Sequence, residues 1–209
     1  MRYLIKKEIN FSFFYIIILG DKMLQDCKIL GLDVSTKSTG WSIVEYKNDK
    51  MELIDYGCIE RCKMSVPEAL VNFEKELINI IEKFRPDVVS AEAPFVGANR
   101  NTIQKLANFH GVMMMTLEKF KMPFVYYAVM TLKSKVLDGI KTKNADGTKK
   151  DGKQMKMEVQ NKVVETFGKE NFIKPLNDDM SDSISCCMTY VIMDGQEVEK
   201  KKKARKKAK

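Results

Sequence analysis

The sequence predicts an α/β fold in which helices flank a mixed sheet of five strands. Short apolar runs have the length of strands, and longer stretches with apolar residues at helical spacing lie between and after them. Three strands come first, followed by helix, strand, helix, strand and two final helices, an order typical of a mixed sheet. At 209 residues, 44% of them hydrophobic, the chain can form one domain with a buried core.

The first three predicted strands form an antiparallel unit. Residues 28–34 are predicted to be a buried strand, and residues 41–46 are its hairpin partner across a turn at 35–40 that is rich in Ser, Thr and Gly. Residues 51–59 supply a third antiparallel strand.

The remaining elements alternate between helix and strand. Apolar residues recur at helical spacing from 66 to 84, where Arg85-Pro86 ends the helix, and residues 87–92 form a short central strand. A second helix is expected over about 101–120. One more strand and two helices follow, over residues 124–129, 156–167 and 179–193.

Three segments differ in composition from the rest of the domain, which we place at residues 28–194. Residues 1–27 are predicted to be an N-terminal extension that is either not native, with Met23 as the natural start, or dispensable. Its apolar run, 11–19, is too short to span a bilayer. Residues 139–155 are predicted to be a flexible basic loop that contains glycines, and residues 195–209 a disordered basic tail.

The net charge of +8 is concentrated near the C-terminus. Residues 200–209 hold eight of the 36 Lys and Arg and no acid, so the other 28 equal the 28 Asp and Glu in number. The tail is therefore a separate electrostatic module, which either adds non-specific affinity for phosphate or only solubilises the protein. A second basic stretch runs from 133 to 156, with eight lysines against three aspartates, and is expected to be a helical turn that leads into the flexible loop.

The cysteines indicate a reducing compartment. They are five in number, contain no Cys-x-x-Cys, and come with a single histidine, which excludes an ordinary zinc finger. We expect the cytoplasm of a bacterial host cell, with no membrane and no small-molecule substrate as partner.

Four acidic residues lie where an apolar run meets a polar break. Asp33 and Glu92 end predicted strands, and Asp179 and Asp182 lie one turn apart at the start of the last helix. Carboxylates at such positions can converge on one point, where they suit hard divalent cations. The pattern predicts metal-dependent phosphate chemistry, although aspartates at a helix start also serve as caps or as partners of the helix dipole.

Taken in order, these motifs resemble the RuvC-type Holliday junction resolvases of the RNase H-like superfamily, of a phage or low-GC bacterial type. The resemblance covers about residues 28–194. It rests on Gly31-Leu32-Asp33-Val34-Ser35-Thr36 with Thr39-Gly40-Trp41, on Glu92-Ala93-Pro94-Phe95 and on Asp179-Met180-Ser181-Asp182-Ser183-Ile184. It implies an RNase H-like fold and a crossover junction endodeoxyribonuclease that resolves four-way DNA junctions by paired symmetric nicks.

The resemblance also implies a metal centre. Asp33, Glu92, Asp179 and Asp182 match the four family carboxylates, which would bind two Mg²⁺ or Mn²⁺ ions in a two-metal hydrolysis. Asp178 is the rival of Asp179 as a ligand, because either residue can begin the helix.

Basic and aromatic residues complete the implied site. Lys133 and Lys156 match two family lysines, and Lys153 is a substitute for Lys156 because the segment between the two matches is longer than in the family. A cation near the scissile phosphate complements charge that develops in the transition state, so Lys156 is assigned a catalytic role as well as DNA binding. Phe95 matches an aromatic residue that stacks on an unpaired base.

Two symmetric cuts need two active sites related by a two-fold axis, so a homodimer is expected. The helix over 101–120 is the expected interface, with Met114 and Leu117 as exposed apolar candidates.

Other functions compete with junction resolution. One is a less selective nuclease on branched or flap DNA, as in phage genome processing. Another is the phosphate-binding fold of sugar kinases and actin-like ATPases, which the loop after Asp33 resembles, but the chain lacks their second domain and second Gly-rich loop. A third is a catalytically dead DNA-binding module, against which the intact acidic set argues.

Overall fold

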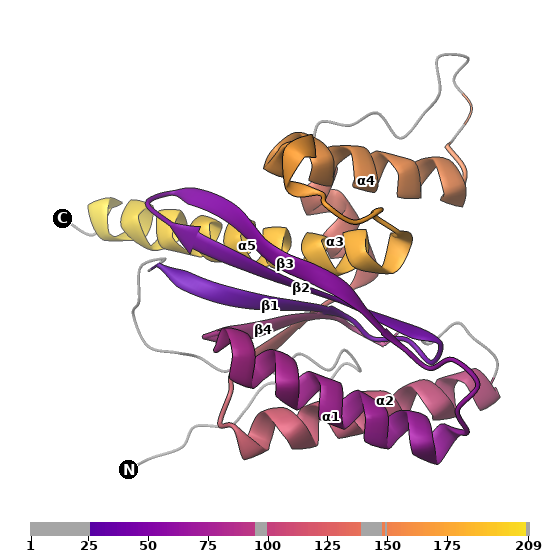
Figure 1. The fold of residues 1–209 in the computed structure, drawn as a ribbon. Coiled ribbons are helices and arrows are strands. Elements are labelled where there is room, and N and C mark those ends of the chain that lie inside the picture. The colour runs from indigo at the N-terminus through magenta and orange to yellow at the C-terminus, as the bar shows by residue number, and fades with distance from the viewer. Residues whose placement is uncertain (1–25, 95–99, 139–147, 149, 208–209) are drawn as a thin grey trace, which may run out of the picture.

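The computed structural model describes residues 26–94, 100–138, 148 and 150–207, with side chains among these as far as residue 193. Within these ranges the chain forms a five-stranded sheet in the order β3-β2-β1-β4-β5, with helices on both faces (Figure 1). The α/β fold with a mixed sheet, predicted from the sequence, is confirmed.

Strand β1 (Cys27–Asp33) joins the two halves of the sheet. On one side it is antiparallel to β2 (Ser38–Lys47), which is antiparallel to β3 (Lys50–Glu60). On the other side β1 is parallel to β4 (Val88–Glu92), and β4 is parallel to β5 (Phe124–Tyr127). The carboxyl ends of the two inner strands β1 and β4 therefore lie side by side, at the same end of the sheet.

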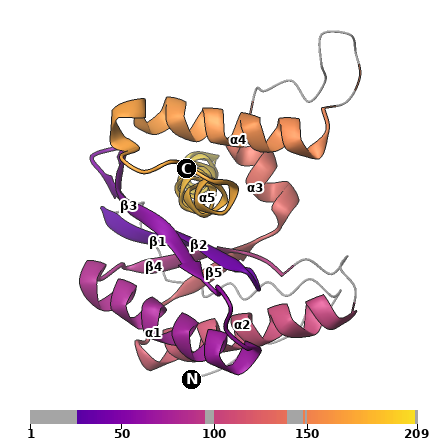
Figure 2. The same ribbon diagram turned by 45° about the vertical axis from the view of Figure 1, so that its right-hand side comes forward.

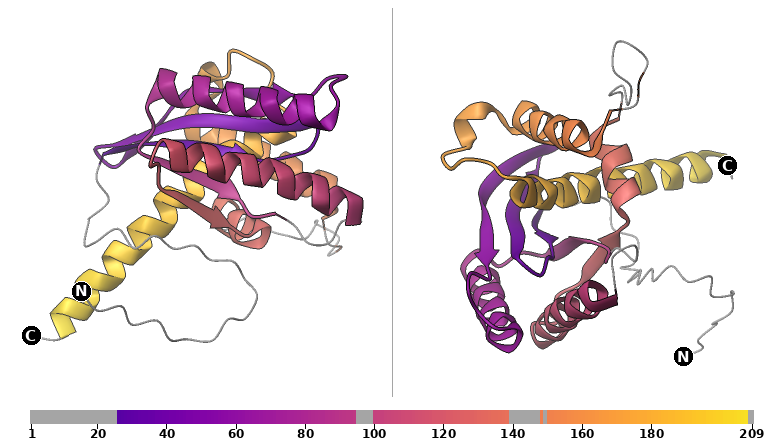
Figure 3. Two further views of the ribbon diagram at one scale, coloured as in Figure 1. Left: turned by 90° about the horizontal axis from the view of Figure 1, so that it is seen from below. Right: turned by 90° about the vertical axis from the view of Figure 1, so that its right-hand side faces the viewer.

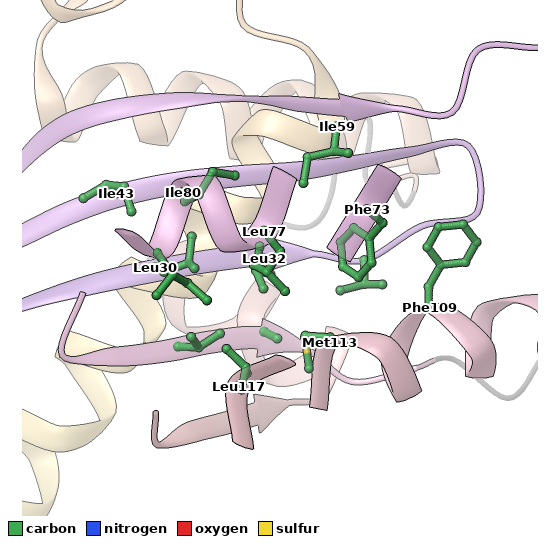
Figure 4. Close-up of a cluster of buried hydrophobic side chains, with 14 of the residues drawn as sticks. Leu30, Leu32, Ile43, Ile59, Phe73, Leu77, Ile80, Phe109, Met113 and Leu117 are labelled. Atoms are coloured by element: carbon green, nitrogen blue, oxygen red, sulfur yellow. The ribbon is translucent and has the colours of Figure 1, made fainter. Parts of the chain in front are cut away.

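One face of the sheet is covered by α1 (Val66–Phe84) and α2 (Arg100–Lys119), as Figure 3 shows in its right-hand view. Every second residue of β1 points to this side, and Figure 4 shows the resulting core. It includes Leu30 and Leu32 of β1, Phe73 and Leu77 of α1, and Met113 and Leu117 of α2.

Of the two residues of α2 that were expected to be exposed at an interface, one is buried. Met114 is 43% exposed, as expected, whereas Leu117 is fully buried in the core. Leu117 faces the sheet because it lies four residues after Met113, on the same buried stripe of the helix. It is therefore not available as an interface residue.

The opposite face carries α5 (Asp178–Lys207), which passes between the sheet and α4 (Gly152–Phe167) (Figure 2). The short helix α3 (Val129–Val136) packs beside it, and a 3-10 turn (Lys169–Asn171) follows α4. Alternate residues of β1 and β4 point to this side, among them Ile29 and Val88 in a second buried cluster.

Small residues bring α5 very close to the sheet. A Cβ atom on Gly31 would lie 2.1 Å from the carbonyl oxygen of Ser183, and one on Gly40 would lie 1.9 Å from that of Asp179. The hydroxyl of Ser90 in β4 donates a hydrogen bond of 2.7 Å to the carbonyl oxygen of Cys186. The backbone of α5 thus lies directly on β1, β2 and β4.

Most boundaries differ from the sequence expectations by at least one residue, and β2, for example, begins at Ser38 rather than at 41. Three of the differences concern β5 and the helices that follow it. The strand expected to reach residue 129 ends at Tyr127, and α3 follows at once. Helix α4 begins at Gly152 rather than 156 because Asp151 and Gln154 form a capping box, so the end of the expected basic loop is helical. The rest of that loop, 139–147 and 149, lies outside the described residues.

The third difference is the length of the last helix. Helix α5 continues to Lys207 instead of ending at Met193, so it includes most of the segment expected to be a disordered tail. Lysine, arginine, alanine and glutamate, which dominate this segment, are strong helix formers and can extend a helix that the core has already started. The proposed extension 1–27 falls almost entirely outside the described residues. No helix in the described part of the chain has the length and apolar character needed to cross a membrane.

Candidate active site

The alternation of side chains along the strands places Asp33 and Glu92 on the α5 face of the sheet. Ile29 and Gly31 of β1 point toward α5, so Asp33, two residues on, points the same way. In β4 the same rule takes Ser90 and then Glu92 to this face. Leu32 is paired with Ala91 across the two parallel strands, so the two carboxylates are neighbours at the sheet edge.

Helix α5 supplies the other two carboxylates from its first two turns. Asn177 caps the helix, since its Oδ1 accepts a hydrogen bond of 2.8 Å from the backbone N–H of Met180. The close contact at Gly40 holds the backbone of Asp179 against β2. Asp182, one turn later, lines the same pocket as Glu92.

The electrostatics show that these carboxylates lie near one another. The pKa of Asp33 is raised from its usual 3.8 to about 8, first by burial and then by the charges of Glu92, Asp182 and Asp179, against the opposing charge of Lys156. Burial, followed by the charge of Asp182, raises the pKa of Glu92 to about 7.

Asp182 follows the same pattern in a weaker form. Its pKa is raised to about 6, chiefly by burial, while the nearby charge of Lys156 opposes the rise. The charges of Asp178 and Asp179 contribute to the rise, and that of Lys133 opposes it. Partly buried like charges therefore gather at this end of the sheet, with lysines as the compensating charges.

The donor set suits a hard divalent cation. All four side chains are carboxylates, the ligand type that such ions prefer, and a cation would relieve their mutual repulsion. Among the described residues, however, no three His, Cys, Asp or Glu side chains form a group with the geometry to hold a metal ion. The chemistry fits a divalent ion, and the side chains would need to draw closer to coordinate it.

A pocket of about 230 Å³ opens beside the carboxylates, between α3 and α4. Lys133 of α3 and Lys156 of α4 line it together with Glu92 and Asp182. The other lining residues are Val129, Leu132, Val136, Val159 and Ser185. Two cations and two carboxylates thus border one cavity at the end of β4.

The other residues predicted for the site are Lys153, Phe95 and Asp178, and neither Lys153 nor Asp178 lines the pocket. Lys153 is exposed on α4, one turn before Lys156, and does not line the pocket. Phe95 lies outside the described residues. Asp178, the rival of Asp179, is paired with Lys156: the ammonium Nζ donates to its Oδ2 at 2.9 Å. The structure therefore brings Lys133 and Lys156 to the acidic cluster but leaves Lys153 apart from it.

Sequence reasoning missed three contributors to this site. Gln160 donates from Nε2 to Asp178 Oδ1 at 2.9 Å, Ser185 lines the pocket, and Gly40 admits the first turn of α5. The spacing of Lys156 and Gln160, four residues apart on one helix face, was the available signal for the first of these.

Comparison with known proteins identifies the family. A family model described as Crossover junction endodeoxyribonuclease RuvC matches residues 29–190. The chain belongs to the RuvC family. A RuvC from Chloroflexus aurantiacus is 31% identical over 166 residues, which are 78% of this chain and 93% of the relative. A RuvC from Fusobacterium nucleatum is 25% identical over 165 residues, covering 78% and 80%.

Solved structures confirm the RNase H-like RuvC fold. Thermus thermophilus RuvC in complex with a Holliday junction substrate superposes with a TM-score of 0.64 at 17% identity, covering 79% of this chain and 93% of that one. The yeast mitochondrial Holliday junction resolvase Ydc2 gives a TM-score of 0.62 at 15% identity, covering 90% and 87%. As a RuvC family member the chain is a crossover junction endodeoxyribonuclease, and enzymes of this family generally depend on divalent metal.

Proposed function

We propose that this chain resolves four-way DNA junctions by paired symmetric nicks, at a site built from Asp33, Glu92, Asp179 and Asp182. The observation that carries the proposal is the gathering of partly buried carboxylates from β1, β4 and α5 beside a pocket lined by two lysines. Junction DNA is the substrate named for the superposing Thermus thermophilus complex, and family membership extends that chemistry to this chain.

The four carboxylates would hold two Mg²⁺ or Mn²⁺ ions. Bound ions would activate water and stabilise the departing 3′-oxygen, which leaves 5′-phosphate and 3′-hydroxyl ends. Asp179 is favoured over Asp178 as the ligand, because Asp179 contributes to the charge around Asp33 whereas Asp178 is engaged by Lys156 and Gln160.

The chain's own cations would act on the DNA. Lys133 and Lys156 sit at the pocket beside Glu92 and Asp182, where they can meet the scissile phosphate and offset the negative charge that develops there. Lys153, exposed on the same helix, would contact the DNA backbone away from the cut. Phe95, which follows the end of β4 by three residues, would stack on an unpaired base at the junction centre.

The active form would be a homodimer, because two symmetric cuts need two sites related by a two-fold axis. Helix α2 is the interface we favour. Met114 and Met115, at 43% and 48% exposed, are large apolar side chains on its outer side, and Phe120 follows at 38%.

A cleavage assay on defined DNA tests the proposal. Purified protein is incubated with a synthetic four-way junction, a flap and a linear duplex, with and without Mg²⁺. We expect paired nicks in the junction only when Mg²⁺ is present. Asp33→Asn and Asp182→Asn should each lower the rate by about a thousandfold or more, because each removes a charge from the metal site.

Glu52→Gln is the matched control, since Glu52 is an exposed acid on β3 that pairs with Glu45 of β2, whereas Asp33 pairs with Gly40 near the other end of that strand. It should cut at the wild-type rate. Equal cleavage of the linear duplex would contradict junction selectivity and favour the less selective nuclease. Wild-type activity in Asp33→Asn would contradict the assigned site.

A further inference from the structure

Asp178 is tied to α4 through both of its carboxylate oxygens. Lys156 Nζ donates to Oδ2 at 2.9 Å, and Gln160 Nε2 donates to Oδ1 at 2.9 Å. Lys156 and Gln160 are four residues apart and so share one face of α4. The carboxylate cannot turn without breaking one of these two hydrogen bonds.

The position of Asp178 differs from that of its acidic neighbours. Glu92 and Asp182 line the pocket, as do Lys133 and Lys156, whereas Asp178 does not. Asp178 is the first residue of α5, and Lys156 both donates to it and lines the pocket. The lysine is therefore tied to a fixed carboxylate at the border of the cavity.

A lysine needs such a partner more than most side chains do. The Lys156 side chain is half exposed, at 50%, and a free lysine loses about 2 kcal/mol of rotamer entropy when it is fixed in one position. A charge-assisted hydrogen bond to a carboxylate that is itself held in place fixes the ammonium before DNA arrives. A cation placed in advance contributes more to the transition state than one that must be ordered during the reaction.

Resting on the function proposed above, we propose that Asp178 is a positioning residue that holds the Lys156 ammonium at the pocket for the scissile phosphate. Asp178 acts through Lys156 and is not a metal ligand. Gln160 supports it by fixing the orientation of the carboxylate.

The test compares Asp178→Asn, Lys156→Met and the double variant by steady-state kinetics on a four-way junction, with Mg²⁺ titrated for each. Asp178→Asn should lower kcat about tenfold, change KM less than about twofold and leave the half-saturating Mg²⁺ concentration unchanged. The double variant should be no slower than Lys156→Met, because Asp178 has no effect once its lysine is gone.

Two further variants separate positioning from general damage. Asp55→Asn is the matched control, because Asp55 also bridges two lysines, Lys83 at 3.4 Å and Lys174 at 3.5 Å, but on β3. It should keep the wild-type kcat. Gln160→Met retains the size of the side chain but loses the donor, and it should lower kcat in the same direction as Asp178→Asn by a smaller factor. Melting temperatures of all variants show whether each one folds.

Three results would overturn the role of Asp178: an unchanged kcat in Asp178→Asn, losses that multiply in the double variant, or a raised Mg²⁺ requirement, which would make it a ligand. Asp33→Asn, measured alongside, separates this inference from the proposed function. Activity lost in Asp33→Asn but kept in Asp178→Asn removes only the positioning role, whereas activity kept in Asp33→Asn removes the proposed site itself.

Discussion

At the residue scale, the site is a set of carboxyls that burial and mutual repulsion hold away from their ordinary ionisation. The pKa of Asp33 is raised to about 8, that of Glu92 to about 7 and that of Asp182 to about 6, in each case chiefly by burial. A raised pKa in the folded state means that ionising these carboxyls costs free energy of folding. The folded protein is therefore most stable at low pH, where the carboxyls are protonated in both the folded and the unfolded state.

The stability of the metal-free protein should therefore fall as pH rises. Between about pH 4 and pH 8 the folded state holds protons that the unfolded chain has released. The stability that these protonated carboxyls contribute is therefore fully present below about pH 4 and lost above about pH 8. We expect the free energy of unfolding in EDTA to drop by roughly 2 to 4 kcal/mol from pH 5 to pH 8.5. Urea unfolding at several pH values measures it.

Asp33→Asn should flatten this pH dependence, because the amide does not titrate, and Glu52→Gln should not. Saturating Mg²⁺ should restore stability at pH 8.5 in the wild type, since ligand binding to the folded state stabilises it. A free energy of unfolding that rises over the same pH interval in EDTA would contradict the burial of these groups.

Residue positions were only partly predictable from sequence. Asp33 and Glu92 could be placed because each ends an apolar run that is clearly a strand. Parallel pairing of β1 with β4 then makes the two residues neighbours. The partner of Asp178 could not be placed, since it depends on where α4 begins and on how that helix crosses α5. The start of α4 has a signal in the sequence, since Asp151 is followed three residues later by Gln154, the spacing of a capping box.

At the element scale, the position of α5 decides whether the carboxylates meet. Its serines allow a close approach because they are small and their hydroxyls are satisfied within the helix. Those of Ser181, Ser183 and Ser185 each donate a hydrogen bond to a backbone carbonyl oxygen three or four residues earlier. Gly31 and Gly40 provide the flat surface on the sheet. A helix of larger side chains would stand further from β1 and carry Asp179 and Asp182 away from Asp33.

Gly40→Ala should displace the start of α5. The new methyl group would meet the backbone carbonyl of Asp179 at 1.9 Å, and a backbone atom cannot move aside as a flexible side chain can. We expect a loss of about 1 to 3 kcal/mol in the free energy of unfolding and a larger proportional loss in nicking rate. Thermal melts and the junction assay measure the two effects.

Gly111→Ala is the control for that change. Gly111 lies within α2 and has no atom within 4 Å of a built Cβ, so alanine there should be neutral or stabilising by up to about 1 kcal/mol. If Gly40→Ala behaved like Gly111→Ala, the close contact between α5 and β2 would not control the site.

At the scale of the whole molecule, positive charge is distributed very unevenly. Residues 200–209 carry eight Lys and Arg, and the rest of the chain is formally neutral. An acidic site that must accept DNA therefore depends on local cations, of which Lys133 and Lys156 border the pocket. The C-terminal segment adds attraction that is independent of the site.

Deleting residues 200–209 should weaken junction binding without moving the cuts. The loss of eight positive charges should lower the affinity at low salt by about tenfold or more and flatten the dependence of binding on salt concentration. Binding titrations at several salt concentrations, with mapping of the nicks, test this. An altered cleavage pattern would mean that the segment helps to choose the site of cutting.

The overall architecture was more predictable than its boundaries. Helix α1 was placed at its exact ends, because its apolar period is clear and Arg85-Pro86 stops it. Helix α3 was predicted only in part, as a helical turn from Lys133, because the sequence from Val129 onward is too short and too mixed to separate the end of a strand from the start of a helix. The extended α5 was missed because helix propensity alone does not decide order in a run of like charges.

The path of α5 between the sheet and α4 also governs how the enzyme can fail. The residues from Ser181 to Thr189 are buried with the single exception of Asp182, so this helix belongs to the most protected part of the chain. An opening that pulls this part of α5 from the sheet would carry Asp182 away from Asp33 and Glu92. Loss of the site and loss of this part of the core should therefore occur together.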